Sequence, residues 1–382
     1  MRKVYASYNN IVSSFGFDSR SAIRQIKEEV SGLQLIDDKN ILPRPFYSSR
    51  IDGNELLERF ELLNPKEAHT RLEQMLIVSL SDTIAKSNIE LTDRVGLIIS
   101  TTKGNIDVLE AQSPFPKERA YLSELGKKVK EFFGFQNEAI VLSNACVSGV
   151  LAVAVAKRLI QQDKYDHVFV AAGDLVTHFI LSGFQAFQAL SDEPCRPYCK
   201  TRSGINIGEV GTSILVTSNE GNLTNESVVI LGEASCNDAN HISGPSRTGE
   251  GLFRSIVSAL KQSGLSSEEI DYISAHGTAT QFNDEMEAVA FNRAGLQDIP
   301  LNSLKGYFGH TLGASGLLET IIGMHSLYQN ALFASKGFQE LGVSQALNII
   351  KKTSSQQINT FLKTSSGFGG SNTAVVFQKV AD

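Results

Sequence analysis

The sequence predicts an α/β protein made of two halves with a similar order of elements, and three observations support this. Short β-rich apolar runs alternate with longer helix-like stretches along the chain, which is typical of a buried sheet covered by helices. The polar stretch 218–226 interrupts this pattern, and the same order then starts again. Low-complexity segments and short repeats are absent. We therefore expect halves at residues 1–220 and 221–382 with the active site between them; two independent α/β domains are the alternative.

The first half contains four apolar runs that are rich in β-forming residues. They predict strands at 96–100, 139–145, 168–173 and 213–216. Helix-like stretches before and between them predict helices at 68–87, 122–133 and 147–161. This succession of strand, helix and strand indicates a mostly buried sheet.

The second half repeats the pattern. Its β-rich runs predict strands at 228–231, 271–275, 358–362 and 373–377. Its helix-like stretches predict helices at 249–263 and 313–330, and residues 302–310 lead into the second of these.

Composition excludes several classes of protein. Of the 382 residues, 42% are hydrophobic and 20% charged, as in an ordinary globular protein. A net charge of −6 and a pI of about 5.7 argue against nucleic acid as the main partner, because no basic surplus neutralises phosphates. Four cysteines in so long a chain do not predict a disulfide framework. The N-terminal residues lack a long apolar segment, and the apolar stretch 145–156 is too short to span a bilayer, so we expect a cytoplasmic protein without membrane insertion.

Cys146 is the first candidate for chemistry. The apolar run that ends at Leu142 gives way to a helix-like stretch from Val147. A cysteine in this position meets the N–H groups and the positive end of the helix dipole, which favour thiolate over thiol. A thiolate attacks a carbonyl or thioester carbon. The alternative is that Cys146 is a small core residue, as most buried cysteines are.

His276 and His310 are the second and third candidates. Each is flanked by glycine or small residues, so that substrate or another part of the chain approaches closely. Each also lies at the end of a strand or before a helix, where α/β sheets place their active sites. A structural or exposed histidine is the alternative for each, and a cysteine protease would also use a cysteine and a histidine.

Six signatures in a fixed order give the chain a resemblance to a known family. They are Asn10–Gly16, the nucleophile motif Ala145-Cys146-Val147-Ser148-Gly149, a middle signature at 189–211, Ala275–Thr280 with Asp284 and Glu287, Lys305 with Gly309-His310 and Glu319, and the glycine-rich 367–372. Together they resemble the β-ketoacyl-acyl-carrier-protein synthases of the elongating type. The resemblance implies the thiolase fold, in which duplicated βαβαβαββ halves form five layers, α-β-α-β-α.

The resemblance also implies a role for each site residue. Cys146 would carry an acyl chain as a thioester, and the backbone N–H groups of Cys146 and Phe368 would form an oxyanion hole. His276 and His310 would stabilise the enolate that malonyl decarboxylation produces. The implied supporting residues are the ion pair Lys305–Glu319, which would orient the histidines, and Thr278 and Thr280, which would bind the phosphopantetheine arm. No cofactor beyond that carrier-borne arm is implied.

Partners follow from the same resemblance. An acidic acyl carrier protein would dock on cations near the tunnel mouth. The candidates are Arg202, Lys66 and Arg71, with the cluster Lys127, Lys128 and Lys130 as a further one; a solvated surface is the alternative for each. The family also implies a homodimer, or a heterodimer with a second ketosynthase-like chain. We expect no metal site, because no acidic or histidine cluster completes a ligand set with Cys195 and Cys199.

The chain departs from the family pattern in length and at one loop. It is shorter at about 35–62 and 290–301, and Ser366 stands where a bulkier residue is usual. These departures suggest a 3-oxoacyl synthase of a specialised, polyene- or polyketide-like pathway. A thiolase-type enzyme is disfavoured because no cysteine follows Cys236. A chain-length factor, the non-catalytic partner of heterodimeric synthases, would usually lack the nucleophile that Cys146 provides.

Overall fold

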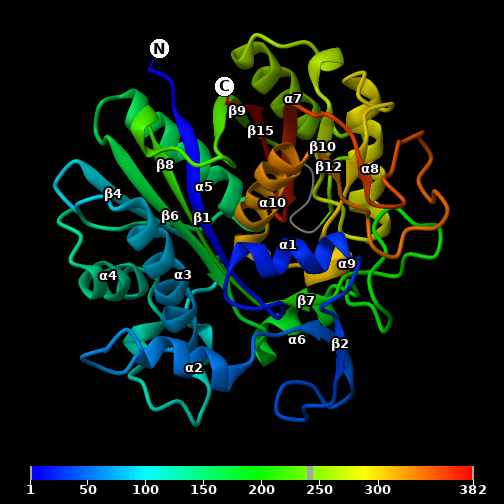
Figure 1. The fold of residues 1–382 in the computed structure, drawn as a ribbon. Coiled ribbons are helices and arrows are strands. Elements are labelled where there is room, and N and C mark those ends of the chain that lie inside the picture. Colours follow the sequence, from blue (N-terminus) through cyan, green and yellow to red (C-terminus); the bar gives the residue numbers. More distant parts are fainter. Residues whose placement is uncertain (1, 239–243, 381–382) are drawn as a thin grey trace.

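The centre of the protein is a ten-stranded sheet to which both halves of the chain contribute (Figure 1). The structure, a computed structural model, describes residues 2–238 and 244–380. In spatial order the strands are β11 (Leu301–Asn302), β10 (Tyr272–Ser274), β14 (Thr360–Gly367), β15 (Ser371–Lys379), β9 (Val228–Asn237), β1 (Tyr5–Val12), β8 (Val210–Thr217), β6 (His167–Asp174), β4 (Val95–Ser100) and β5 (Ile140–Leu142).

The two halves have the same strand topology. In the first, β4 pairs in parallel with β5 and β6, and β8 pairs antiparallel with β6 and β1. In the second, β10 pairs in parallel with β11 and β14, and β15 pairs antiparallel with β14 and β9. Strands β1 and β9 join the halves through the pairs Tyr5–Val229 and Ala6–Val228. The expected duplication is therefore confirmed, although the boundary at residue 220 stays a prediction; Met1 and residues 381–382 lie outside the described residues.

Two helices lie between the halves, and the other long helices cover the outer faces. Helices α5 (Ser148–Gln161) and α10 (Ser315–Gln329) contact each other and strands of both halves. Helix α3 (Arg71–Ser87) covers β1, β6 and β8, and α4 (Leu122–Phe133) covers β5. On the opposite side α7 (Glu250–Ser263) covers β9 and β15, with α8 (Gln281–Arg293) beside it. These five layers confirm the predicted fold.

Glycines allow the two central helices to approach closely at their first turns. A Cβ on Gly149 would lie 2.6 Å from the backbone nitrogen of Leu317, and one on Gly316 would lie 2.5 Å from that of Val150. Contacts this short exclude any side chain at either position. The N-termini of α5 and α10, and with them the segments that carry Cys146 and His310, are consequently held side by side.

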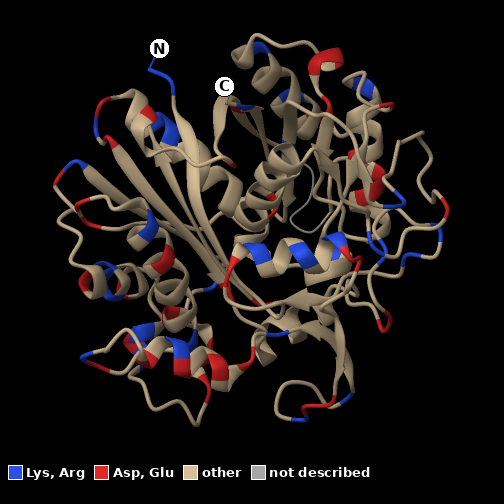
Figure 2. Ribbon diagram, viewed as in Figure 1, with Lys and Arg blue, Asp and Glu red and all other residues tan. Residues whose placement is uncertain are grey.

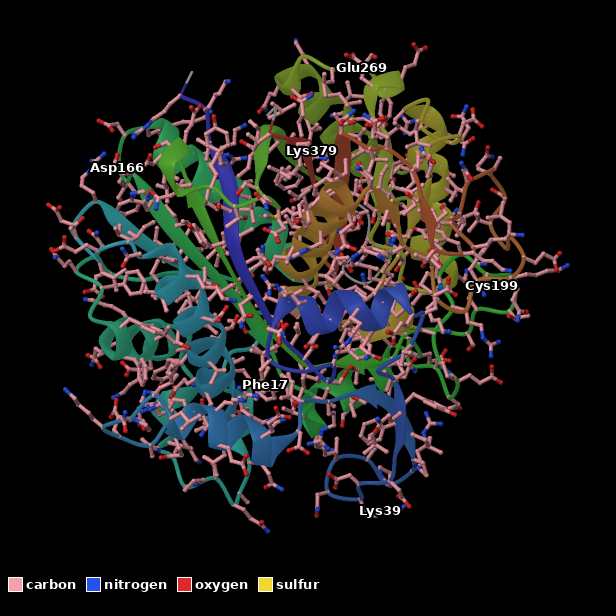
Figure 3. All side chains as sticks on the ribbon, in the orientation of Figure 1. Phe17, Lys39, Asp166, Cys199, Glu269 and Lys379 are labelled. Carbon is pink, nitrogen blue, oxygen red and sulfur yellow. The ribbon has the colours of Figure 1, made fainter. Side chains whose placement is uncertain are left out.

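Smaller elements complete the structure. They are α1 (Ser19–Lys27), α2 (Gly53–Glu61), α6 (His178–Ala186), α9 (Lys305–Phe308), the three-stranded sheet of β2 (Gln34–Ile36), β3 (Phe46–Ser49) and β7 (Ile207–Gly208), and the pair β12 (Ala331–Leu332) and β13 (Ser354–Ser355). Lys39, on the loop after β2, lies at the edge of the molecule (Figure 3). Five helices were not predicted, namely α1, α2, α6, α8 and α9. Strand β14 extends beyond the predicted 358–362, so Lys363 belongs to a strand rather than to a loop.

Charged residues lie mainly on the outer helices and connecting loops (Figure 2). Several charged residues are nevertheless fully buried, among them Lys305, Glu319, Lys363 and Glu287. Burying a charge is costly unless it is paired and hydrogen-bonded. The region around these four residues is therefore a candidate functional site. Among the described residues, no helix is long and apolar enough to cross a membrane.

Candidate active site

Cys146 lies on a tight turn between β5 and the first turn of α5. Ala145, which precedes it, has φ of +45°, a conformation that costs energy for a residue with a Cβ. The hydroxyl of Ser148 holds this turn: it accepts a hydrogen bond from the Asn144 N–H at 2.7 Å and donates to the Ala145 carbonyl at 2.6 Å. The turn presents the thiol to the interior, where Cys146 is 7% exposed.

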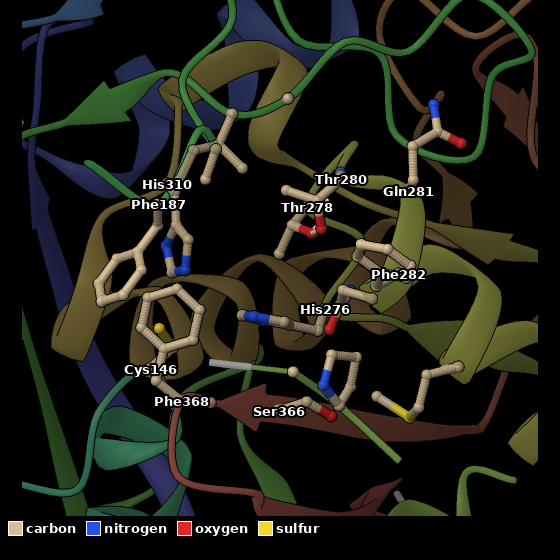
Figure 4. A pocket seen from close by; sticks show the side chains of 18 of the residues that line it. Cys146, Phe187, His276, Thr278, Thr280, Gln281, Phe282, His310, Ser366 and Phe368 are labelled. Carbon is tan, nitrogen blue, oxygen red and sulfur yellow. Dashed lines mark hydrogen bonds between the residues drawn. The ribbon is translucent and has the colours of Figure 1, made fainter. Parts of the chain in front are cut away.

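The glycine-rich segment 366–370 lies directly against this turn. A Cβ on Gly367 would be 3.1 Å from the backbone nitrogen of Cys146. Phe368, the next residue, stacks on Phe184 with ring centroids 5.7 Å apart and contacts Phe187 at 5.3 Å. The backbone of Phe368 therefore lies near Cys146 while its ring lines the cavity, as Figure 4 shows.

Two buried carboxylates hold the loop that carries His276. Glu287 accepts hydrogen bonds from the backbone N–H groups of His276 at 2.9 Å and Gly277 at 2.7 Å. Asp284 accepts from the N–H groups of Thr278 and Ala279. Both carboxylates come from α8, so this helix fixes the histidine loop through its first two turns.

The ring of His310 has a defined tautomer. The backbone N–H of Leu312 donates to its Nδ1 at 3.1 Å, and the hydroxyl of Ser315 lies 3.0 Å from the same atom. A neutral imidazole whose Nδ1 accepts a hydrogen bond carries its proton on Nε2. His310 therefore offers an Nε2–H donor on the side away from Leu312.

The ring of His276 is oriented by the predicted ion pair. Lys305 donates to Nδ1 of His276 at 3.4 Å and to the carbonyl of the same residue, and it pairs with Glu319 at 2.8 Å. An ammonium has only donors, so Nδ1 of His276 is an acceptor and its proton also lies on Nε2. Lys305 and Glu319 thus form the ion pair beside His276 that the family resemblance implied.

The three candidate residues converge on one cavity. One ligand atom from each of Cys146, His276 and His310 lies within 4.8 Å of the other two, and the imidazole centroids are 5.2 Å apart. The cavity, of about 550 Å³, is also lined by Phe368, Thr278 and Thr280 (Figure 4). The two threonine hydroxyls lie 2.8 Å apart, on the side of His276.

The thiol and imidazole groups of Cys146, His276 and His310 are close enough to bind a metal ion, but their hydrogen bonds do not leave the nitrogen lone pairs free. A metal needs an imidazole nitrogen with a free lone pair. Both Nδ1 atoms already accept hydrogen bonds from the protein, and both Nε2 atoms carry protons in that arrangement. The donor set is therefore arranged to donate hydrogen bonds into the cavity.

Electrostatics differ between the thiol and the imidazoles. Burial raises the pKa of the Cys146 thiol to about 12, against the opposing effect of Lys305. The expectation of a thiolate stabilised by the helix N-terminus is therefore wrong for the resting protein, because desolvation disfavours the charged form more strongly. Burial, followed by the charge of Lys305, holds the pKa of His276 and of His310 well below the ordinary value. Both imidazoles are neutral donors at physiological pH.

The predicted docking cations differ in how far they are exposed to solvent. Arg202 is buried, donates to the carbonyls of Cys199 and Gly342, and lies 3.6 Å from Asp284. The prediction that it presents a surface charge is therefore wrong, since tertiary packing encloses it. Arg71 pairs with the buried Glu209 at 2.7 Å.

Of the three predicted docking cations, Lys66 is the exposed one. In the predicted lysine cluster, Lys128 and Lys130 pair with acidic side chains of the chain itself, and Lys127 is exposed. Cys199, which lies toward the edge of the molecule in Figure 3, and Cys195 are free thiols with no role in the cavity.

Sequence reasoning missed one buried group beside this site, Lys363. Its side chain lies 2.7 Å from Glu319 Oε2, on the opposite oxygen from Lys305. A lysine inside an apolar strand was the available signal, but the strand was expected to end at Leu362.

Comparison with known proteins gives the family. Residues 17–221 match the N-terminal domain of β-ketoacyl synthases and residues 227–339 their C-terminal domain. The chain is 27% identical over 335 residues to 3-oxoacyl-[acyl-carrier-protein] synthase 2 of Vibrio cholerae, covering 80% of each chain. It is 27% identical over 379 residues to the tetracenomycin polyketide synthase ketoacyl synthase alpha subunit of Streptomyces glaucescens, covering 87% of each.

A solved structure agrees in fold. The ketosynthase ApeO in complex with its chain length factor ApeC, from Xenorhabdus doucetiae, is similar with a TM-score of 0.88 and 23% identity, over 99% of this chain and 98% of that one. The two matched domains cover most of the chain, and the converging thiol and imidazoles lie where the halves meet. The protein belongs to the β-ketoacyl synthase family and is a condensing acyltransferase.

Proposed function

We propose that the protein is a 3-oxoacyl-[acyl-carrier-protein] synthase that condenses a malonyl group with an acyl chain held on Cys146. The observation that carries this proposal is the convergence of one thiol and two neutral Nε2–H donors on a single cavity. A protease would need an imidazole that accepts the thiol proton, whereas both Nε2 atoms here are donors.

In the first half-reaction the acyl group moves from the carrier to Cys146. The Sγ atom attacks the carrier thioester, and the backbone N–H groups of Cys146 and Phe368 stabilise the tetrahedral oxyanion. Because burial raises the pKa of Cys146, the thiol keeps its proton until the acyl donor arrives. The departing phosphopantetheine thiolate takes that proton, so the step is balanced without an external base.

In the second half-reaction the malonyl thioester loses carbon dioxide. The electron pair of the broken C–C bond forms an enolate, and the Nε2–H groups of His276 and His310 donate to its oxygen. The enolate carbon then attacks the acyl–Cys146 thioester, and Cys146 leaves as a thiolate that takes up a proton from the solvent. The product is a 3-oxoacyl thioester one two-carbon unit longer. No cofactor or metal enters either half-reaction.

The substrates would arrive on an acidic acyl carrier protein. The hydroxyls of Thr278 and Thr280 line the cavity and are placed to bind a polar pantetheine arm. With Arg202 buried, the exposed cation Arg247 is a better docking candidate, because it follows Pro245 at the cavity by two residues. Reversing its charge with Arg247→Glu would raise the KM for the carrier, while the same change at Lys3, an exposed lysine outside the cavity lining, would not.

We also propose a dimer. Strand β5 ends the ten-stranded sheet and is only partly buried, so a second chain would extend the sheet at this edge. A heterodimer with a chain-length factor is the second candidate assembly, and the presence of Cys146 with both histidines would make this chain its active subunit. The mass of the purified protein, alone and co-expressed with a candidate partner, distinguishes the two. A cytoplasmic location stays a prediction.

The direct test is a reconstituted condensation. Purified protein, malonyl carrier protein and acyl carrier protein should release carbon dioxide and form a 3-oxoacyl product. Cys146→Ala should abolish the product, and Cys236→Ala, which removes a partly buried cysteine outside the cavity, should not. Unchanged condensation by the Cys146 variant would remove the mechanism.

The specialised pathway is a finer proposal. Ser366 lines the cavity and donates to Asn372 at 2.7 Å, so a small polar group occupies this part of the wall. We expect the enzyme to prefer unsaturated or oxygenated acyl groups. Turnover across chain lengths and unsaturations tests this, and a plain preference for saturated C4–C14 chains would contradict it.

A further inference from the structure

Lys363 is a fully buried lysine in the interior strand β14, and neither half-reaction described above uses it. Its ammonium lies 2.7 Å from one carboxylate oxygen of Glu319, while Lys305 lies 2.8 Å from the other. One carboxylate therefore serves two buried cations. The cluster of Lys305, Glu319 and Lys363 carries one positive charge more than an ion pair.

The surroundings of Lys363 offer only hydrogen-bond acceptors, and the charge of Glu319 opposes the lowering of the Lys363 pKa by burial. Besides Glu319, its nitrogen donates to the backbone carbonyls of Ser274 at 3.1 Å, Ala275 at 3.5 Å and Thr364. All four partners are acceptors, so the nitrogen must supply donors. A second buried charge is costly, and an apolar residue would fill an interior strand at a lower desolvation cost. The presence of a cation here consequently points to a task beyond holding the sheet together.

The position of Lys363 connects it to His276. Strands β14 and β10 are parallel neighbours, and Lys363 pairs in register with Ser274. The carbonyls of Ser274 and Ala275 that it holds belong to the two residues that precede His276. Lys305 holds the carbonyl and Nδ1 of His276 itself. The two lysines, which both pair with Glu319, therefore hydrogen-bond to the carbonyls of three consecutive residues that end at His276.

We propose that Lys363 is a positioning residue for the condensation step: it fixes the strand end that carries His276 and adds a positive charge that keeps the imidazole a neutral Nε2–H donor. This inference rests on the proposed function, in which that donor stabilises the enolate. The charged and titratable groups that act in this region are Lys305 from α9, Glu319 from α10, Glu287 from α8, the Cys146 thiol, and His276 and His310 themselves.

The electrostatic effect supports the geometry. The positive charge of Lys363 contributes to holding the pKa of both imidazoles low, after burial, Lys305 and His310 for His276 and after burial and Lys305 for His310. A protonated imidazole would still donate a hydrogen bond, but it would also bind the malonyl carboxylate and oppose loss of carbon dioxide. A second cation behind the imidazoles therefore favours the state in which decarboxylation proceeds.

Lys363→Met tests both parts of the proposal. It leaves Lys305 and Glu319 as a balanced ion pair, so we expect the fold to survive. Loss of the hydrogen bonds from Lys363 displaces His276. We expect malonyl decarboxylation to fall by about 10²-fold, which is the cost of displacing a catalytic group by about 1 Å. Loss of the charge raises the pKa of His276, so the acidic limb of the pH–rate profile moves to higher pH.

Lys157→Met is the matched control. Lys157 is also a buried lysine, and it donates to the carbonyl of Leu231 at 2.9 Å, but it lies outside the cavity lining. It should change neither the rate nor the pH profile.

Lys363→Gln separates the charge from the hydrogen bonds, because its amide still donates to the carbonyls. It should recover part of the rate yet keep the shifted acidic limb, and it carries the test if the Met variant does not fold. Titration of the His276 ring by NMR gives a readout that needs no turnover, so it still tests Lys363 if the wild-type protein fails to condense. An unchanged His276 titration and an unchanged acidic limb in the folded variants would overturn the proposal.

Discussion

Cys146 and the two histidines reach the same cavity from opposite halves of the molecule, and they are held there by different means. Cys146 is placed by backbone geometry: a turn with a positive φ at Ala145, a helix start, and glycine contacts from the neighbouring segments. His276 and His310 are placed by buried polar partners, which include Lys305, Glu319 and Glu287. The halves share a strand topology, but the interactions that hold Cys146 differ from those that hold the two histidines.

This difference has a functional consequence. A nucleophile needs a fixed location and a proton that leaves late, and a rigid turn in an apolar wall provides both. Donors to an enolate need a fixed tautomer as well, which only specific hydrogen-bond partners define. Substitutions in the first region should therefore affect acyl transfer, and those in the second should affect decarboxylation.

The largest expected effect separates the two half-reactions. Cys146→Ala should lower condensation by about 10⁴-fold or more, as removal of a nucleophile does in other enzymes. Malonyl decarboxylation should continue, because the enolate donors remain. His310→Ala should lower decarboxylation by about 10²–10³-fold, the cost of one oxyanion donor. Carbon dioxide release and product formation, measured in the same reaction, check both, and equal loss of both activities in the Cys146 variant would contradict the division.

The next effect concerns stability. Glu319→Gln leaves Lys305 and Lys363 as unpaired buried cations, and we expect the free energy of unfolding to fall by about 3–5 kcal/mol, as when one partner of a buried ion pair is removed. Glu250→Gln is the control, because Glu250 pairs with Arg254 and Arg293 on the surface, and it should leave the free energy nearly unchanged. Denaturant unfolding curves measure both variants. Similar stabilities would mean that the carboxylate does not support the histidine region.

The sequence was sufficient to find the three residues that converge on the cavity, but not all of the residues that support them. Cys146, His276 and His310 sit in short motifs beside strand and helix signals, so local patterns identified them. Lys363 was missed because its role depends on the parallel register between β10 and β14, which brings it next to Ser274 from a distant part of the chain.

Two expectations failed for a related reason. The expected lowering of the Cys146 pKa is outweighed by burial, in a cavity that residues of both halves line. Arg202 resembles a surface cation in sequence, yet Gly342 and Asp284, both distant in the chain, enclose it. The sequence indicated the residue types, but it did not indicate how distant parts of the chain bury them.

A smaller effect follows from the raised pKa of Cys146. With a value of about 12, the thiolate fraction rises about tenfold for each pH unit up to that value, so alkylation of Cys146 by iodoacetamide should accelerate about tenfold per unit between pH 8 and 11 without a plateau. Mass spectrometry of the labelled peptide follows the rate. A plateau near neutral pH would instead mean that the helix N-terminus dominates and that the nucleophile, like the histidines, is tuned by charge.

The smallest effect tests the backbone turn itself. Ser148→Ala removes the hydroxyl that bridges Asn144 and Ala145, and the loss of these two hydrogen bonds should lower the free energy of unfolding by about 1–2 kcal/mol. Because the bridge holds Ala145 in its strained conformation, acylation of Cys146 should slow by a few fold, while decarboxylation stays unchanged. Thr83→Ala, which removes a buried hydroxyl from α3, should cost similar stability without slowing acylation. Decarboxylation that falls together with acylation in the Ser148 variant would show that the turn and the histidine network act as one unit rather than two.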